Sequence, residues 1–242
     1  TDHKILSSIF YFVGTIQIFY GLFIYLYVIY KIEVGPKKVP LNSQKEGLYF
    51  SAMDIITLTN VYGINLIIAG KISVDYLGVF FAICIILRVY EAFVHSTDFV
   101  VMPSSGELDK QGLIVIIIKN LIIGFLISLF FVVFGKLLLS FVYAQKYDEY
   151  LYLIPYICII GCTKMMDIIP SSIIGGISSK NTLKRYLLFN IILTALFIPA
   201  SILSIHSFGL KGAAFSIIIL YTLKSLFGFD LLYRKFELEQ AG

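Results

Sequence analysis

Four ionisable side chains recur at helical spacing inside one long apolar stretch, residues 76–102: Arg88, Glu91, His95 and Asp98. At about 100° per residue they fall within an arc of about 80° on one helix face. A charged side chain that faces hydrocarbon costs roughly 2.5–3.5 kcal/mol, so this face is expected to turn away from lipid. Such a face inside a membrane indicates a transport pathway or a binding cavity.

Two lysines are expected at the same depth as Arg88. If each apolar stretch is centred on the bilayer, Lys164 and Lys224 both lie near the middle of their own stretches. Three cations at one depth suit an anionic substrate. An alternative is that Arg88 with Glu91, and Lys164 with Asp167, form structural ion pairs at i, i+3 spacing. Lys224 has no acid within one turn, so it needs a partner from another helix, water or a ligand.

Two further polar residues share a face on an earlier stretch. Asp54 and Asn65 are separated by about 20° on a helical projection. They either complete the wall of a cavity or hydrogen-bond across a helix interface. His95 either relays protons with Glu91 or is a hydrogen-bonded structural residue.

The composition identifies an integral membrane protein. Of the 242 residues, 59% are hydrophobic and 14% are charged, whereas soluble domains average roughly 25% charged. The predicted fold class is all-α, a polytopic bundle of about seven transmembrane helices. The expected spans are 5–30, 48–70, 76–102, 113–134, 150–177, 186–205 and 212–233, with an amphipathic piece at 135–149.

The expected organisation is a single transmembrane helix within residues 1–30, a cytoplasmic linker over 31–47, and a six-helix bundle over 48–242. The chain starts with Thr1 rather than Met, so it is expected to be a piece of a longer protein. Basic residues in the connections number ten on one side and five on the other, which places the first side in the cytoplasm. The N-terminus is therefore predicted outside and the C-terminus inside.

Several short blocks follow one another in a recognisable order. They are Asn65–Gly70 followed by Leu77–Phe80, the turn Pro103–Glu107, the segment Gly135–Tyr147, and Phe208–Ala214. Together they resemble the polysaccharide and lipid-linked oligosaccharide flippases of the multidrug/oligosaccharidyl-lipid/polysaccharide exporter superfamily, which includes O-antigen and capsule repeat-unit flippases. Asn65 stands where the family has an acid, and Phe80 where it has Tyr.

The resemblance implies that the chain is the family's sixth helix followed by its second six-helix bundle. It implies a transporter in the bacterial cytoplasmic membrane that flips an anionic lipid-linked oligosaccharide for surface polysaccharide export. The implied partners are an undecaprenyl-pyrophosphate-type substrate, membrane lipids and the N-terminal bundle of the same protein. The substrate-cavity candidates, selected from their charge, depth and helical spacing, are Asp54, Asn65, Arg88, Glu91, His95, Asp98, Lys164, Asp167 and Lys224.

Two other functions compete with the flippase. A cation-coupled multidrug exporter of the same superfamily would favour acids over bases at the midplane. A membrane-embedded polysaccharide polymerase or acyltransferase would need catalytic residues on sizeable loops, and the longest polar stretch is only residues 31–47. The sequence also lacks a metal-type His cluster, a Walker loop and a dinucleotide-binding turn. We therefore expect no enzyme activity, no metal or cofactor, and no nucleic-acid partner.

Overall fold

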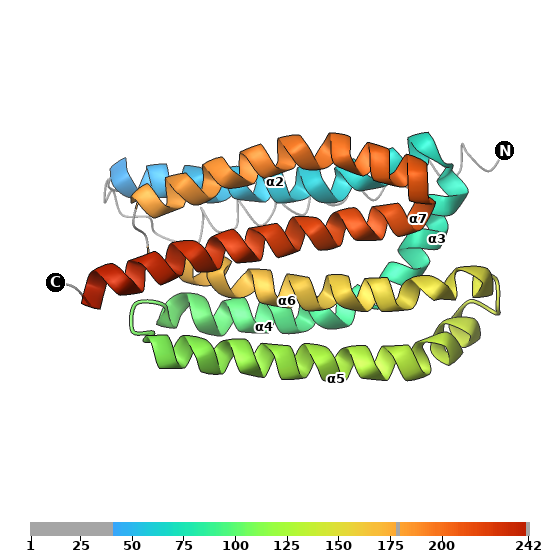
Figure 1. Cartoon of the computed structure of the whole chain (residues 1–242), viewed down its shortest axis with the longest axis horizontal. Helices are drawn as coiled ribbons and strands as arrows, with labels where there is room; N and C mark the ends of the chain where they lie inside the picture. The colour runs from blue at the N-terminus through green and yellow to red at the C-terminus, as the bar shows by residue number, and fades with distance from the viewer. Residues whose placement is uncertain (1–40, 178–179, 241–242) are drawn as a thin grey trace, which may run out of the picture. The chain divides into compact units, whose positions relative to one another are not determined.

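The computed structural model describes residues 41–177 and 180–240 of the chain (Figure 1). These residues form α-helices and one 3-10 helix, with no strand in the described ranges, which confirms the predicted all-α class. The chain divides into two compact units, Thr1–Gln44 and Lys45–Gly242. All of the predicted site residues belong to the second unit.

The helices follow one another with short connections. Their bounds are α2 Leu41–Lys71, α3 Val74–Cys84, α4 Leu87–Ser104, α5 Lys110–Val142, η1 Asp148–Leu153, α6 Ile154–Ile177 and α7 Lys180–Gln240. In the described part, four helical stretches are long and apolar enough to cross a membrane, or five if the bent pair α3 and α4 is one span. The chain is therefore a multi-pass membrane protein by length and composition. The predicted span at 5–30 lies outside the described residues, so a total of seven stays a prediction.

Helix α2 begins earlier than expected. The predicted linker extended to Gly47, but the helix already begins at Leu41. A proline inside a helix removes a hydrogen bond and disfavours the helix, and no proline lies between Pro40 and Pro103. The polar composition of residues 41–47 therefore does not prevent them from extending the helix.

The stretch 76–102 was expected to be one continuous helix, and this expectation is wrong. Helices α3 and α4 meet at an angle of 56°. At the junction the backbone forms 3-10-type bonds, from the Ile86 N–H to the Ile83 carbonyl (3.3 Å) and from the Arg88 N–H to the Ile85 carbonyl (3.0 Å). Such tighter turns redirect a helix without any proline or glycine, so the sequence gives no local signal of the break.

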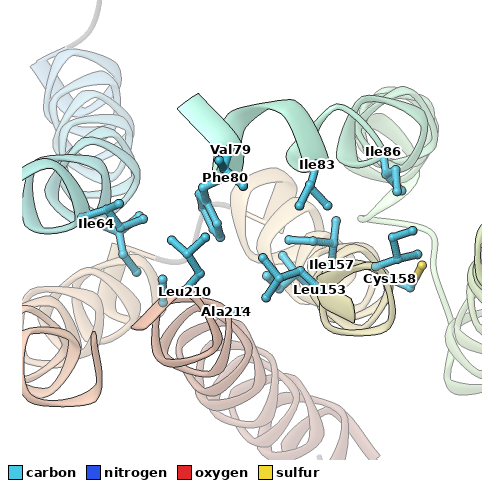
Figure 2. Close-up of a cluster of buried hydrophobic side chains, with 14 of the residues drawn as sticks. Ile64, Val79, Phe80, Ile83, Ile86, Leu153, Ile157, Cys158, Leu210 and Ala214 are labelled. Carbon is cyan, nitrogen blue, oxygen red and sulfur yellow. The ribbon is translucent and has the colours of Figure 1, made fainter. Parts of the chain in front are cut away.

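The bend keeps both helices against α6. Ile83 lies in the last turn of α3 and Ile86 is the N-cap residue of α4, and each is no more than 2% exposed. Figure 2 shows Ile83 directed toward Leu153 and Ile157, and Ile86 beside Cys158. Burial of these apolar side chains on both sides of the break compensates for the lost helical hydrogen bonds.

Helix α5 is longer than predicted and absorbs part of the amphipathic piece. It starts after Asp109, whose side chain accepts a hydrogen bond from the Gly112 N–H at 2.7 Å, and it continues to Val142. The predicted end near Phe134 is wrong, since the helix continues through Gly135, which is buried and allows close packing. A Cβ at that position would touch Ile154 at 3.4 Å.

Helix α7 contains the two last predicted spans. Its 61 residues include one non-helical position, Gly209, with φ 59° and ψ −135°. Glycine adopts positive φ without steric penalty, so it suits this break. In Figure 1 the orange arm of α7 leads to the break and the red arm leads back. The predicted connection between residues 205 and 212 thus falls at a real interruption.

Helix α6 forms the centre of the described bundle. It packs against α4, α5 and α7. The candidate membrane span in Asp148–Gly176, which comprises η1 and most of α6, is 61% buried, against 17% for the spans in α2 and α5. Because α5 and α2 keep most of their apolar side chains exposed, they are the helices that would face lipid. The polar residues of α6 must therefore face its helical neighbours.

Candidate functional site

A polar cavity of about 560 Å³ lies among α2, α4, α6 and α7. Seven of the nine residues predicted from the sequence line it: Asp54, Glu91, His95, Asp98, Lys164, Asp167 and Lys224. The predicted shared face of α4 is confirmed for Glu91, His95 and Asp98. The role of these residues in substrate binding stays a prediction.

One carboxylate of the cavity pairs with two cations. Glu91 lies 2.9 Å from Arg88 on its own helix and 2.9 Å from Lys164 on α6, through different carboxylate oxygens. The predicted Arg88–Glu91 pair therefore forms. The Arg88 side chain is 81% exposed and does not line the large cavity.

A second ion pair joins α6 to α7. Lys224 lies 3.1 Å from Asp167, and the two side chains are only 11% and 9% exposed. Of the partners left open for Lys224, namely another helix, water or a ligand, the structure shows an acid from another helix. The alternative Lys164–Asp167 pair on one helix is not formed, because Lys164 turns to Glu91. The other oxygen of Asp167, Oδ1, is buried and has no hydrogen-bond partner.

Both lysines approach the same aromatic ring, a feature that the sequence reasoning missed. Tyr221 is buried, and its ring centroid lies 5.7 Å from Lys164 Nζ and 5.5 Å from Lys224 Nζ. Both distances fall within the range of cation–π attraction. The available signal was the i, i+3 spacing of Tyr221 and Lys224, which places both on one side of a helix.

Hydroxyl and amide groups complete the wall on the side of Asp98. The Ser172 hydroxyl donates to Asp98 at 2.6 Å, and Ser171 and Tyr186 share a hydrogen bond of 2.7 Å. Asn190 donates to the Tyr186 carbonyl at 2.8 Å. Sequence reasoning did not select these residues, because Ser and Asn in membrane helices commonly serve helix packing.

The charge on the lining differs from the expectation of free cations. Four carboxylates line the cavity, Asp54, Glu91, Asp98 and Asp167, against two lysines that are both paired. With His95 neutral, the lining carries a formal charge of −2, the difference between two lysines and four acids. The idea of an unpaired cationic seat for an anion is therefore corrected. Helical periodicity misses the neutralising acids because they lie on other helices.

The remaining predicted residues line a smaller neighbouring cavity of about 170 Å³. Arg88 and Asn65 lie there together with Asn60, whose side-chain oxygen is buried without a hydrogen-bond partner. Asp54 and Asn65 were expected to share a helix face that either lines one cavity or bonds across a helix interface, and they line different cavities. The cavities share Glu91, Lys164 and Tyr221 in their linings.

The described residues contain no group of three or more His, Cys, Asp or Glu side chains placed to hold a metal ion. Cys84, Cys158 and Cys162 are free thiols. No family model matches the chain, and searches of curated proteins and of solved structures also return no match.

Proposed function

We propose that the chain belongs to a membrane transporter whose polar cavity holds the sugar portion of a lipid-linked oligosaccharide during its transfer across the bacterial cytoplasmic membrane. The observation that supports this proposal most is the cavity of about 560 Å³ inside an apolar bundle, with ionisable side chains from four helices. Its volume falls within the roughly 300–1,000 Å³ of typical small-molecule sites.

The chemistry of the wall suits sugars better than a bare anion. Asp54 and Asp98 offer carboxylate oxygens, and Ser171 and Asn190 offer hydroxyl and amide groups. Each sugar hydroxyl both donates and accepts, so a wall that mixes acceptors with donors can satisfy several of them. The ring of Tyr221 adds an apolar surface against which a sugar ring can pack.

In this proposal the lysines have a different role from the one expected. Lys164 and Lys224 neutralise Glu91 and Asp167, which keeps carboxylates charged in a surrounding of low dielectric. A substrate phosphate would have to compete with these acids for the lysines. The substrate is still proposed to be the anionic, undecaprenyl-pyrophosphate-type lipid implied by the resemblance.

The transporter is proposed to sit with the N-terminus of this chain outside and its C-terminus in the cytoplasm, as the distribution of basic residues favours. Its further partner is an N-terminal bundle of the same protein. Rocking of two bundles about the substrate would alternate access between the leaflets, a common plan among transporters built from repeats.

The test is an isosteric substitution at a lining residue that holds no ion pair. We expect Asp54→Asn and Asp98→Asn in the full-length protein to reduce surface polysaccharide while expression stays normal. The matched control is Asp230→Asn, which removes an exposed acid paired with Arg234 away from the cavity. Normal polysaccharide in both cavity variants would contradict a sugar-binding role for this wall.

The acidic lining favours a second candidate, a cation-coupled multidrug exporter. Among the described residues neither Asp54 nor Asp98 forms a salt bridge, and Asp98 accepts a hydrogen bond from the Ser172 hydroxyl. Carboxylates of this kind can bind a cationic drug or a coupling ion. Efflux of a cationic dye that is lost in Asp98→Asn, with surface polysaccharide unchanged, would favour this exporter over the flippase.

A further inference from the structure

A separate cavity lies at the end of the bundle where α2 ends and α7 breaks. It has a volume of about 350 Å³ and is lined by residues of four segments, among them Lys71, Tyr76, Tyr152, His206 and Gly209. It shares no lining residue with the two polar cavities described above. Its surroundings are exposed, with Tyr76 at 38% and Tyr152 at 45%.

The charge of this cavity is opposite to that of the large one. Lys71 and His206 line it, and no carboxylate does. None of the salt bridges among the described residues involves Lys71. A third base lies at its edge, since Lys211 Nζ is 4.8 Å from the centre of the Tyr152 ring. Among the described residues no acid forms a salt bridge with Lys71 or Lys211, so an anion at this place meets two lysines that are not already paired.

The surrounding side chains place the cavity at the depth of lipid headgroups. Lys71 ends the apolar helix α2, and Gly209 separates the two apolar arms of α7, so the cavity lies at the ends of candidate spans. Tyr76 packs edge-on against Tyr150, with centroids 5.8 Å apart. Tyrosines at helix ends are typical of the membrane–water interface, and basic pockets between membrane helices bind anionic headgroups.

From these observations we propose that this cavity binds the phosphate of an anionic phospholipid in the adjacent leaflet. Lys71 pairs with the phosphate, and His206 and the Tyr76 and Tyr152 hydroxyls lie around it as hydrogen-bonding groups. The acyl chains follow the exposed apolar surface, where Phe208 at the cavity is 64% exposed. This site is independent of the proposed transport cavity.

The test is lipid retention by the purified protein, measured by native mass spectrometry after release from nanodiscs of phosphatidylglycerol or phosphatidylcholine. Wild-type protein is expected to retain phosphatidylglycerol selectively. Lys71→Ala weakens that retention roughly fivefold, as removal of one basic residue near a membrane surface implies, and Lys71→Arg preserves it. The matched control is Lys136→Ala, which removes another exposed lysine, on α5 and outside this cavity.

Two results would overturn the assignment. Equal retention of phosphatidylglycerol by Lys71→Ala and Lys136→Ala would show that the lysine does not hold a headgroup. Inorganic phosphate that binds to protein in phosphatidylcholine nanodiscs, in a Lys71-dependent manner and without phosphatidylglycerol selectivity, would assign the site to a free anion. Thermal unfolding of each variant establishes that the exposed substitutions leave the fold intact.

Discussion

Lys164 on α6 and Glu91 on α4 form an ion pair of 2.9 Å across a helix interface, and Glu91 keeps a second cation, Arg88, at the same distance. The two partners are therefore not equivalent. Without Lys164, the carboxylate still has Arg88. Without Glu91, the lysine loses the only carboxylate within salt-bridge distance among the described residues.

This difference between the two partners predicts different thermal stabilities for two variants, each of which replaces one charged side chain with an uncharged one. Glu91→Gln should lower the unfolding temperature more than Lys164→Met, because an unpaired charge in a largely buried place costs about 3–5 kcal/mol. The double variant Glu91→Gln/Lys164→Met should regain much of the loss. Thermal unfolding of the purified proteins in one detergent measures all three. Equal losses of thermal stability in the two single variants would show that Arg88 does not compensate the charge of Glu91 when Lys164 is replaced.

The buried pair of α6 and α7 predicts a strong coupling. Lys224→Met leaves Asp167 as an uncompensated carboxylate that is only 9% exposed, and Asp167→Asn leaves the lysine unpaired. Each single change should destabilise by about 3–5 kcal/mol, and the double change Lys224→Met/Asp167→Asn by much less. A double-mutant cycle in thermal or denaturant unfolding checks this. Additive losses would contradict a direct pair.

The contrast between these two ion pairs shows what the sequence can predict. The periodicity of Glu91, His95 and Asp98 predicts a shared polar face, and the structure confirms it. The partner of Lys224 is not predictable in the same way, because Asp167 lies on a different helix, α6, far from Lys224 along the chain. Helical periodicity describes one helix at a time, whereas ion pairing depends on how helices pack.

The long spans are likewise easier to predict than their interruptions. Apolar composition predicts α2, α5 and α6 well, because length and hydropathy determine which helices can cross a membrane. The break between α3 and α4 escapes prediction since Ile85 and Ile86 look like ordinary span residues.

Two glycines provide a matched test of helix packing. Gly161 on α6 faces the ring of Tyr90, and a Cβ there would overlap the ring atoms, whereas a Cβ at Gly63 on α2 would meet nothing within 4 Å. Gly161→Ala should therefore destabilise the bundle by about 1–3 kcal/mol through overpacking. Gly63→Ala should be neutral or stabilise by up to about 1 kcal/mol through helix propensity.

The same thermal unfolding assay compares the two alanine variants. The hydroxyls of Tyr90 and of Ser128 on α5 also share a hydrogen bond of 2.8 Å, so the ring has little freedom to move aside. A Gly161→Ala variant as stable as Gly63→Ala would mean that the helices separate easily at this point.

Because both Lys164 and Lys224 approach the ring of Tyr221, we expect the ring to contribute more to the stability of the bundle than the hydroxyl does. Tyr221→Phe keeps the aromatic face toward Lys164 and Lys224, so we expect an unfolding temperature close to that of the wild type. Tyr221→Leu removes the cation–π attraction to both lysines and should destabilise by about 1–2 kcal/mol beyond any change in packing. To separate the two effects, Tyr221→Leu is repeated in the Lys224→Met/Asp167→Asn background, where one cation is absent. In that background Tyr221→Leu should lower the stability by less than it does in the wild type. An equal loss of stability in both backgrounds would mean that Tyr221 stabilises the bundle by packing alone.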